Sequence, residues 1–356
     1  MTYLEQVKAA LWGLPVEEQP LDEQLLDRHM RQGTAPLVFP LLPMTPPMKA
    51  VCVSTIQQQV KILHTLRIAW DALTRAGIQP VLMKGAGLAA LYPSPEQRAY
   101  GDIDLYVGQA QYHPACAVMR ETFPNALKFD EELDHYKHYN LIADGISIEI
   151  HRVTVDLQHP CDHRRYARIE AYGMAHAVPV TCNPLPVTLT IPEPTFNALL
   201  IMLHSWEHMM TRGANLRQLC DLTLLLHHYA TQIDSQRLKT YLTSLHLLDV
   251  WQLYMFILVN HLGLPQNEAL FYTNDAHLAL RAEHLLNDLL DGRLIEPEHT
   301  QPAPKGRFAR KFHTMRQRMA NARRIGHYSP SYGRHLVATT LLHGASRLFA
   351  KDRHWE

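Results

Sequence analysis

The residues best suited to carry chemistry lie in the stretch Gly101-Asp102-Ile103-Asp104-Leu105-Tyr106-Val107. Polar and apolar residues alternate here at a period of two, which predicts a strand with Asp102 and Asp104 on one face. Side chains two residues apart on a strand are about 6–7 Å apart, so the two carboxylates repel each other. A divalent cation held between them removes that repulsion. The spacing therefore predicts a metal site.

A third carboxylate, Glu149, lies on a second predicted strand. Asp144-Gly145 is a strong two-residue hairpin signal, and the run Ile146-Ser147-Ile148-Glu149-Ile150-His151 follows it. Its isoleucines face one way, whereas Glu149 and His151 face the other. If this strand lies beside the first, Glu149 joins the two aspartates. His151 either contacts phosphate or the acceptor, or it is a structural residue at the end of a strand.

Upstream of the Asp-x-Asp strand, a glycine turn predicts an anion site. Val81-Leu82-Met83 has the length of a buried strand, and Lys84-Gly85-Ala86-Gly87 follows at once. A helix that begins in such a turn has free backbone N–H groups and a dipole that favours phosphate. Three carboxylates and a phosphate cradle are the parts required for two-metal nucleotidyl transfer.

Two cations lie close to this turn in the sequence. Lys84 precedes the glycine, and Arg98 lies in the loop 93–100. Both are candidate ligands of a triphosphate, whose β- and γ-phosphates require cations. The alternative for Arg98 is an ion pair with Glu96 or Asp102. The His-Tyr-Lys-His run at 135–138 contains candidates to line an acceptor pocket.

This ordered set resembles the polymerase-β-like nucleotidyltransferase superfamily, and most closely its group of uncharacterised bacterial nucleotidyltransferases. The resemblance rests on KGAG, the loop with Arg98, GDIDLYV and IEIH, and it extends to a helical segment over 203–221. It implies an α+β fold with a mixed sheet flanked by helices, a helical N-terminal segment and a mostly helical C-terminal half. One departure is Gly85-Ala86, which lacks the serine that many active members use to touch a phosphate.

The resemblance also implies an activity. A Mg²⁺-dependent enzyme of this kind moves a nucleoside monophosphate from an NTP, such as ATP, to an acceptor hydroxyl and releases pyrophosphate. Two Mg²⁺ ions, or Mn²⁺ in their place, are expected. The implied catalytic and metal-binding residues are Asp102, Asp104 and Glu149, and the implied nucleotide-binding residues are Lys84, Gly85, Ala86, Arg98 and His151. The sequence does not say whether the acceptor is a small molecule or a protein.

Two alternative functions fit parts of the sequence. The first is a non-catalytic nucleotide-binding or antitoxin-like regulatory module of the same fold. The second rests on His204, Glu207 and His208, whose HxxEH order is that of inverted zinc peptidases. A peptidase also requires a distant acidic ligand, for which Glu170 and Glu193 are candidates. Arg217 and Asp221, four residues apart on the same predicted helical half, are expected to form an ion pair on or between helices.

Length and composition suggest one large domain or two ordinary ones. The chain has 356 residues, of which 47% are hydrophobic, and its formal net charge is zero. We expect an N-terminal helical segment over 1–76, a nucleotidyltransferase core over 77–191, a helical domain over 192–296 and a basic helical tail over 297–356. An apolar stripe from Val53 to Trp70 predicts a helix that supports the first strand. The remaining predicted elements are helices at 111–122, 194–211, 214–230, 234–245, 247–262 and 275–291 and an edge strand at 186–191, with 153–185 mixed.

The tail differs from the rest of the chain in charge. Residues 301–356 contain 12 Lys and Arg against 2 Asp and Glu, whereas the other 300 residues contain 22 against 32. Phe308, Phe312, Met315 and Met319 share one helical stripe among these basic residues. Such a helix could bind an acidic partner, RNA or a membrane surface, although we expect it to pack on the acidic body of its own chain.

The remaining features concern location. The five cysteines are odd in number, scattered and without a CxxC pair, which is typical of reduced thiols. The N-terminus lacks the basic start and long apolar run of a signal peptide. No stretch approaches 18 uninterrupted apolar residues, so we expect no membrane span. These features together predict a cytoplasmic protein.

Overall fold

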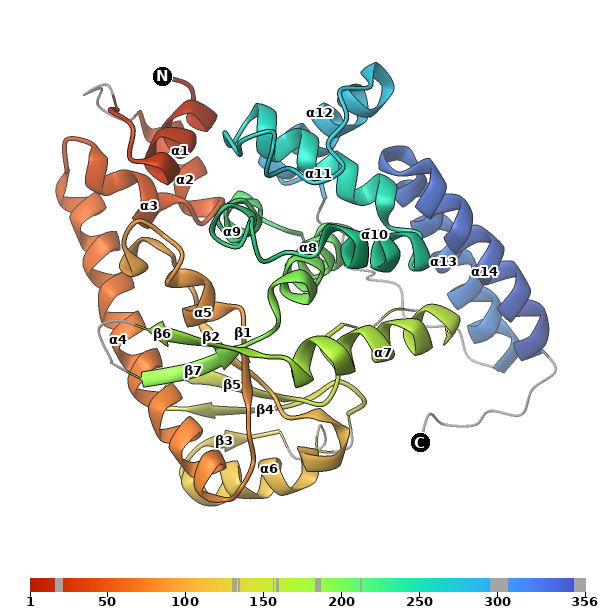
Figure 1. Ribbon diagram of the computed structural model, residues 1–356, viewed down its shortest axis with the longest axis horizontal. Coiled ribbons are helices and arrows are strands. Elements are labelled where there is room, and N and C mark those ends of the chain that lie inside the picture. Colours follow the sequence, from red (N-terminus) through yellow and green to blue (C-terminus); the bar gives the residue numbers. More distant parts are fainter. Residues whose placement is uncertain are drawn as a thin grey trace.

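The computed structural model describes residues 1–16, 22–129, 133, 135–155, 157, 160–182, 187–211, 213–294 and 307–348. Within these residues a five-stranded sheet is flanked by helices (Figure 1). Its order is β1 (Val81–Met83), β2 (Asp102–Tyr106), β5 (Ile146–His151), β4 (His138–Ala143) and β3 (Leu127–Lys128). β2 and β5 are parallel, and every other pair in this sheet is antiparallel. The predicted α+β class with a mixed sheet is confirmed.

The hairpin between β4 and β5 forms where the sequence predicts it. Asp144 has φ 50° and Gly145 has φ 80°, the two positive values that a type I′ turn requires. The turn fixes the register, so Ser147 lies opposite Ile142 and Glu149 lies opposite Asn140. The isoleucines of β5 are buried on one face, which leaves Glu149 on the other.

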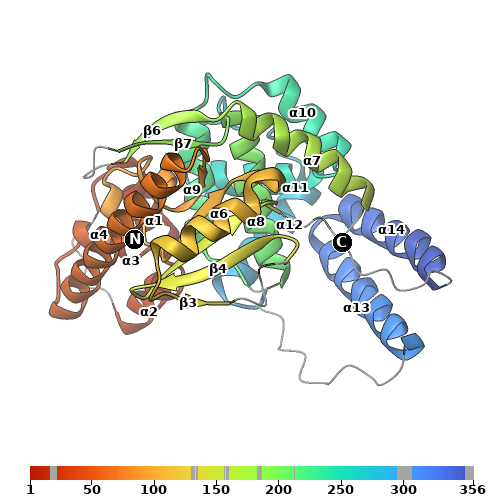
Figure 2. The same cartoon turned by 90° about the horizontal axis from the view of Figure 1, so that it is seen from below.

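Two helices cover the isoleucine face of the sheet. They are α4 (Pro46–Arg75) and α6 (Gly108–Thr122), which pack on each other and on β5 (Figure 2). α4 begins only after the proline-rich segment, where the chain forms the short helix α3 (Ala35–Val38) and a 3₁₀ turn, η1 (Phe39–Leu41). The prolines at 36, 40, 43, 46 and 47 prevent one continuous helix here.

The predicted apolar stripe of α4 is wrong in its first half. Val53, Ile56 and Val60 are 52%, 44% and 55% exposed, whereas Ile62 and Leu66 are buried. A helix of 30 residues is about 45 Å long, which is much longer than the strands it covers. Only its second half therefore packs under the sheet.

The helical half matches the predicted elements closely. It comprises α8 (Pro194–Thr211), α9 (Leu216–His228), α10 (Ser235–Ser244), α11 (Leu248–Asn260) and α12 (Ala276–Leu290). The segment 153–185, predicted to be mixed, contains α7 (Pro160–Ala175) and the strand β6 (Val178–Cys182). β6 pairs with β7 (Val187–Ile191) in a separate two-stranded sheet.

The N-terminal helices pack on the helical half. α1 (Tyr3–Trp12) ends where the Trp12 indole donates a 2.6 Å hydrogen bond to the carbonyl of Leu262. Just after α2 (Glu23–Arg31), the Gln32 amide donates to the carbonyl of Leu289 at 3.1 Å and accepts the N–H of Leu216 at 2.8 Å. Segments from both ends of the sequence thus share one core. The division at residues 76, 191 and 296 stays a prediction.

The predicted basic helix is present as α13 (Arg307–Tyr328), and it pairs with a further helix, α14 (Pro330–Leu348) (Figures 1 and 2). The turn between them is held by Tyr328 on Asp288 and by Ser329 on Asp249, both at 2.7 Å. Residues 297–304, at the start of the predicted tail, and the side chains of Phe308 and Phe312 lie outside the described residues. None of the described helices combines the length and apolar character needed to cross a membrane.

Candidate nucleotidyltransferase site

The register of the two parallel strands brings the three carboxylates together. Asp104 of β2 lies directly beside Glu149 of β5, and Asp102 lies beside Ser147. Neighbouring strands are about 4.8 Å apart, and all three acidic side chains are on the face opposite the isoleucines. The convergence that the strand alternation predicts is therefore present, whereas metal binding by these residues stays a prediction.

Asp104 is the most enclosed of the three. Its residue is 1% exposed, with Lys84 Nζ 2.9 Å from Oδ2 and His151 Nε2 3.0 Å from Oδ1. Burial opposes its ionisation, but Lys84 and the hydrogen bond with His151 outweigh burial and hold the pKa of Asp104 well below its usual range. Asp104 is therefore a carboxylate whose charge is balanced by its own chain.

The pKa of Asp102 is shifted in the opposite direction from that of Asp104. The negative charge of Asp104, followed by burial, raises its pKa, and Glu149 adds to the effect while Lys84 opposes it. The face therefore carries more negative charge than its internal cations neutralise. A bound cation would relieve this excess.

His151 lies between the carboxylates. Its Nε2 is 3.0 Å from Asp104 Oδ1 and 3.1 Å from Glu149 Oε2, and its Nδ1 is 3.3 Å from the carbonyl oxygen of Val153. These two partners raise the pKa of His151 although burial lowers it. The imidazole is directed at the acidic residues, and a direct contact of His151 with phosphate or acceptor stays a prediction.

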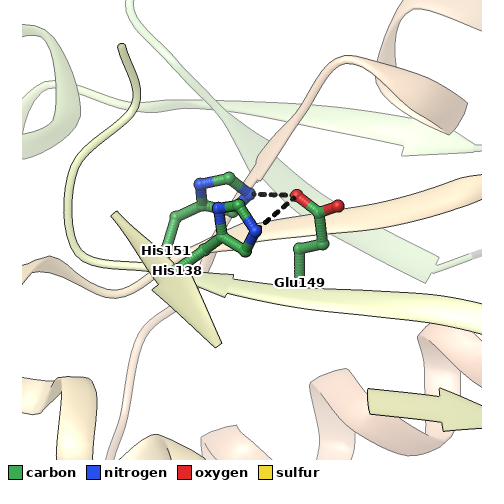
Figure 3. Close-up of side chains that lie close together, drawn as sticks. All are labelled: His138, Glu149 and His151. Carbon is green, nitrogen blue, oxygen red and sulfur yellow. Dashed lines mark hydrogen bonds and ion pairs between the residues drawn. The ribbon is translucent and has the colours of Figure 1, made fainter. Parts of the chain in front are cut away.

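His138 adds a contact that sequence reasoning missed. It lies opposite His151 in the hairpin register, with the ring centroids 5.0 Å apart. Its Nε2 is 4.0 Å from Glu149 Oε2 (Figure 3). Burial lowers the pKa of His138 to about 4, so it is neutral at physiological pH. Among 23 histidines, only its position across the Asp144-Gly145 turn could have singled it out.

The glycine turn is tightly constrained. Lys84 has φ 54° and Gly85 has φ 42°, and a positive φ is uncommon for a residue other than glycine. The helix that follows, α5 (Gly85–Ala89), has five residues. Ala86 is buried. Since alanine has no hydroxyl, this position can offer a phosphate only its backbone N–H. The Lys84 amine lies 2.9 Å from Asp104 Oδ2, so the turn contacts the acidic face directly.

The buried Arg98 side chain stabilises this turn through hydrogen bonds. Its Nε is 2.6 Å and its Nη2 is 2.8 Å from the two carboxylate oxygens of Asp221, and its Nη1 donates to the Gly85 carbonyl at 3.1 Å. The partner is therefore Asp221 of α9 rather than Glu96 or Asp102. The predicted pair between Arg217 and Asp221 is present only at 3.8 Å, because the Asp221 carboxylate already binds Arg98.

The zinc-peptidase set does not assemble. Glu193 accepts the N–H of Phe196 at 2.9 Å, and Glu170 accepts the N–H of Thr154 at 2.7 Å. Within the described residues, the groups of three His or acidic side chains close enough to hold a metal are His138, Glu149 and His151, and Asp162, His246 and His335. Neither group includes the two histidines of the HxxEH motif. Its glutamate, Glu207, lies 3.6 Å from Lys137 Nζ.

Residues 24–263, more than half of the chain, match the protein family described as "Uncharacterised nucleotidyltransferase". The chain belongs to this family. A solved structure of an antigenic nucleotidyltransferase-like protein from Paracoccidioides brasiliensis is similar at 16% identity and a TM-score of 0.34, over 53% of this chain and 87% of that chain. No curated protein matches the chain.

The part that matches the nucleotidyltransferase family contains the whole candidate site. It includes the Lys84–Gly85 turn, β2, β5 and the α9 residue Asp221 that binds Arg98. The helices α12, α13 and α14 follow the end of the matched range. The acidic site is thus part of the nucleotidyltransferase unit rather than an addition to it.

Proposed function

We propose that this nucleotidyltransferase moves a nucleoside monophosphate from an NTP to an acceptor hydroxyl and releases pyrophosphate. The single observation that supports this most strongly is the pairing of Asp104 with Glu149 across the parallel strands β2 and β5. With Asp102 it gives three carboxylates on one face, beside a glycine turn that can approach a phosphate. Family membership supports the transferase class.

The donor set fits Mg²⁺. Asp102 and Asp104 offer oxygen ligands, which Mg²⁺ prefers, and the raised pKa of Asp102 indicates negative charge that a cation would offset. We propose that these two residues hold the ions and that Glu149 completes the position nearest the acceptor. A divalent cation at that position would lower the pKa of the acceptor hydroxyl, and Mg²⁺ on the two aspartates would offset charge on the phosphates.

The protein's own groups would then act as follows. Glu149 would take the proton of the acceptor hydroxyl, since its partner His151 lowers its pKa against the effect of burial and keeps it ionised. The acceptor oxygen would form a bond to the α-phosphorus as the bond to pyrophosphate breaks. The backbone at Gly85 and Ala86 would approach a phosphate, and Lys84 would neutralise negative charge developing on it.

A non-catalytic nucleotide-binding module is the second candidate. The favouring observation is that Arg98, one of the two cations predicted to bind the triphosphate, is already engaged within the chain. Arg98 is paired with Asp221, and Ala86 stands where many active relatives are expected to have a serine. The fold would then bind nucleotide without turnover.

A transfer screen with radiolabelled NTPs separates these functions, with Asp104→Ala as the inactive variant. The proposed transferase gives Mg²⁺-dependent pyrophosphate release and labelled acceptor, both lost in Asp104→Ala. A binding module gives a nucleotide-dependent rise in melting temperature without pyrophosphate release. Equal labelling by wild type and Asp104→Ala contradicts the catalytic assignment.

A further inference from the structure

We propose that His138, Glu149 and His151 form a site for a divalent transition-metal ion of the Zn²⁺ class. The inference rests on the proposed function, since Glu149 belongs to the same acidic face. It goes further by assigning the position nearest the acceptor to an ion other than Mg²⁺, and by giving His138 a role. Figure 3 shows both imidazoles directed at one oxygen of Glu149.

The spacing of the ligand atoms is close to that of a metal site. One nitrogen or oxygen from each of the three residues lies within 4.8 Å of the other two. His151 Nε2 is 3.1 Å from Glu149 Oε2, and His138 Nε2 is 4.0 Å from the same oxygen. Ligand atoms at about 2.1 Å from a tetrahedral ion are about 3.4 Å apart. Small side-chain rotations would therefore complete the coordination.

His151 is held as a metal-binding histidine usually is, whereas His138 is positioned by its strand. His151 Nδ1 is 3.3 Å from the carbonyl of Val153, and a metal-binding histidine typically donates its second N–H to such a partner. This leaves Nε2 directed at the carboxylates. His138 Nδ1 is buried and has no hydrogen-bond partner among the described residues, so its ring is not committed elsewhere. Both residues lie on paired strands, which fixes their positions.

The chemistry of the donors argues against Mg²⁺ at this position. Imidazole nitrogen suits Zn²⁺ and its neighbours, whereas Mg²⁺ prefers oxygen ligands and retains several waters. Asp104 Oδ1, 3.0 Å from His151 Nε2, is a further oxygen within reach. The pair Asp102 and Asp104 offers oxygen alone. The two halves of the site would thus select different ions.

A second cluster of His and carboxylate side chains would compete for the added ion. His335 Nε2 is 2.6 Å from Asp162 Oδ2, and the rings of His246 and His335 stack at 4.0 Å. Arg165 already lies 3.1 Å from the other oxygen of Asp162. Since this cluster has similar donors, the test is made in a His246→Gln background that removes one of them.

The experiment is a Zn²⁺ titration of untagged, chelator-stripped full-length His246→Gln protein against a chromophoric chelator. We expect one Zn²⁺ bound per chain, no displacement by a large excess of Mg²⁺, and affinity at least about tenfold weaker when His138→Gln is added. Absence of stoichiometric binding, displacement by Mg²⁺, or unchanged affinity in the double variant overturns the proposal.

A second measurement keeps the proposal testable if the double variant does not fold, because it uses the His246→Gln protein alone. Co²⁺ added to the His246→Gln protein should give the visible absorption of a tetrahedral site. A spectrum identical to that of Co²⁺ in buffer overturns the proposal. Mg²⁺-dependent pyrophosphate release by a protein that binds no Zn²⁺ contradicts this inference and leaves the proposed function intact. Zn²⁺ binding without pyrophosphate release supports the metal site and contradicts the transferase.

Discussion

Arg98 and Asp221 are 123 residues apart in the sequence and form a bidentate, buried ion pair, with N–O distances of 2.6 and 2.8 Å. Arg98 also donates to the carbonyl of Gly85 at 3.1 Å, and Tyr92 donates to Asp221 at 2.8 Å. Helix α9 is thereby tied to the glycine turn of the acidic site. These contacts join the helical half to the sheet.

Asp221→Asn should destabilise the protein by about 3–5 kcal/mol, because removing one partner leaves a buried charge uncompensated. The free energy of unfolding in urea measures this. Asp27→Asn is the matched control, since Asp27 and Arg31 form a pair whose side chains are 59% and 56% exposed, and such pairs contribute at most about 1 kcal/mol. An equal decrease in the free energy of unfolding in the two variants would show that the buried pair stabilises the protein no more than the exposed pair does.

The same pair predicts a dependence on pH. Arg98 outweighs burial and lowers the pKa of Asp221 below its ordinary value of 3.8. A lowered folded-state pKa gives stabilisation that is present above the unfolded-state value and is lost as the pH falls through the folded-state value. The difference in unfolding free energy between wild type and Asp221→Asn should therefore shrink as the pH falls below 3.8. A difference that stays constant down to strongly acidic pH would contradict the assignment.

Lys84→Gln should lower the melting temperature of the metal-free protein, because Lys84 neutralises the acidic face through Asp104 at 2.9 Å. Added Mg²⁺ should raise the melting temperature of this variant more than that of wild type, since the ion replaces the lost charge. Differential scanning fluorimetry with and without chelator measures both effects. An identical Mg²⁺ response in the two proteins would argue against a metal at these carboxylates.

Much of the site could be predicted from local pattern. Strand alternation placed Asp102 and Asp104 on one face, and the Asp144-Gly145 turn fixed where β4 ends and β5 begins. The remaining step, that β5 lies beside β2 and brings Glu149 to the aspartates, is a hypothesis about two distant strands, and their parallel direction was not predicted. It holds because their isoleucine and leucine residues bury on the same face against α4 and α6.

What local pattern could not predict depends on long-range partners. Arg98 and Asp221 each have ordinary neighbours in sequence, so nothing local distinguishes a buried pair from a surface pair. The first half of α4 has a regular apolar stripe, yet Val53 and Val60 are exposed because the sheet does not extend that far. The peptidase motif failed for the same reason, since its third ligand had to come from elsewhere in the fold.

Glu149→Gln should reduce nucleotidyl transfer by at least about a hundredfold, because it removes both a metal ligand and the proposed base. Asp144→Asn is the control on the same hairpin. Asp144 is exposed and has φ 50°, a conformation that asparagine tolerates. Its activity should match wild type in the labelled-NTP assay. If both variants are equally active, Glu149 has no part in the chemistry.

The most direct test of the central claim is a crystal structure with a nonhydrolysable NTP and Mn²⁺, measured at a wavelength where manganese scatters anomalously. We predict an anomalous peak in contact with Asp102 and Asp104, with the triphosphate beside the Lys84–Gly85 turn. A nucleotide bound away from these carboxylates, or a peak that touches none of them, would contradict it.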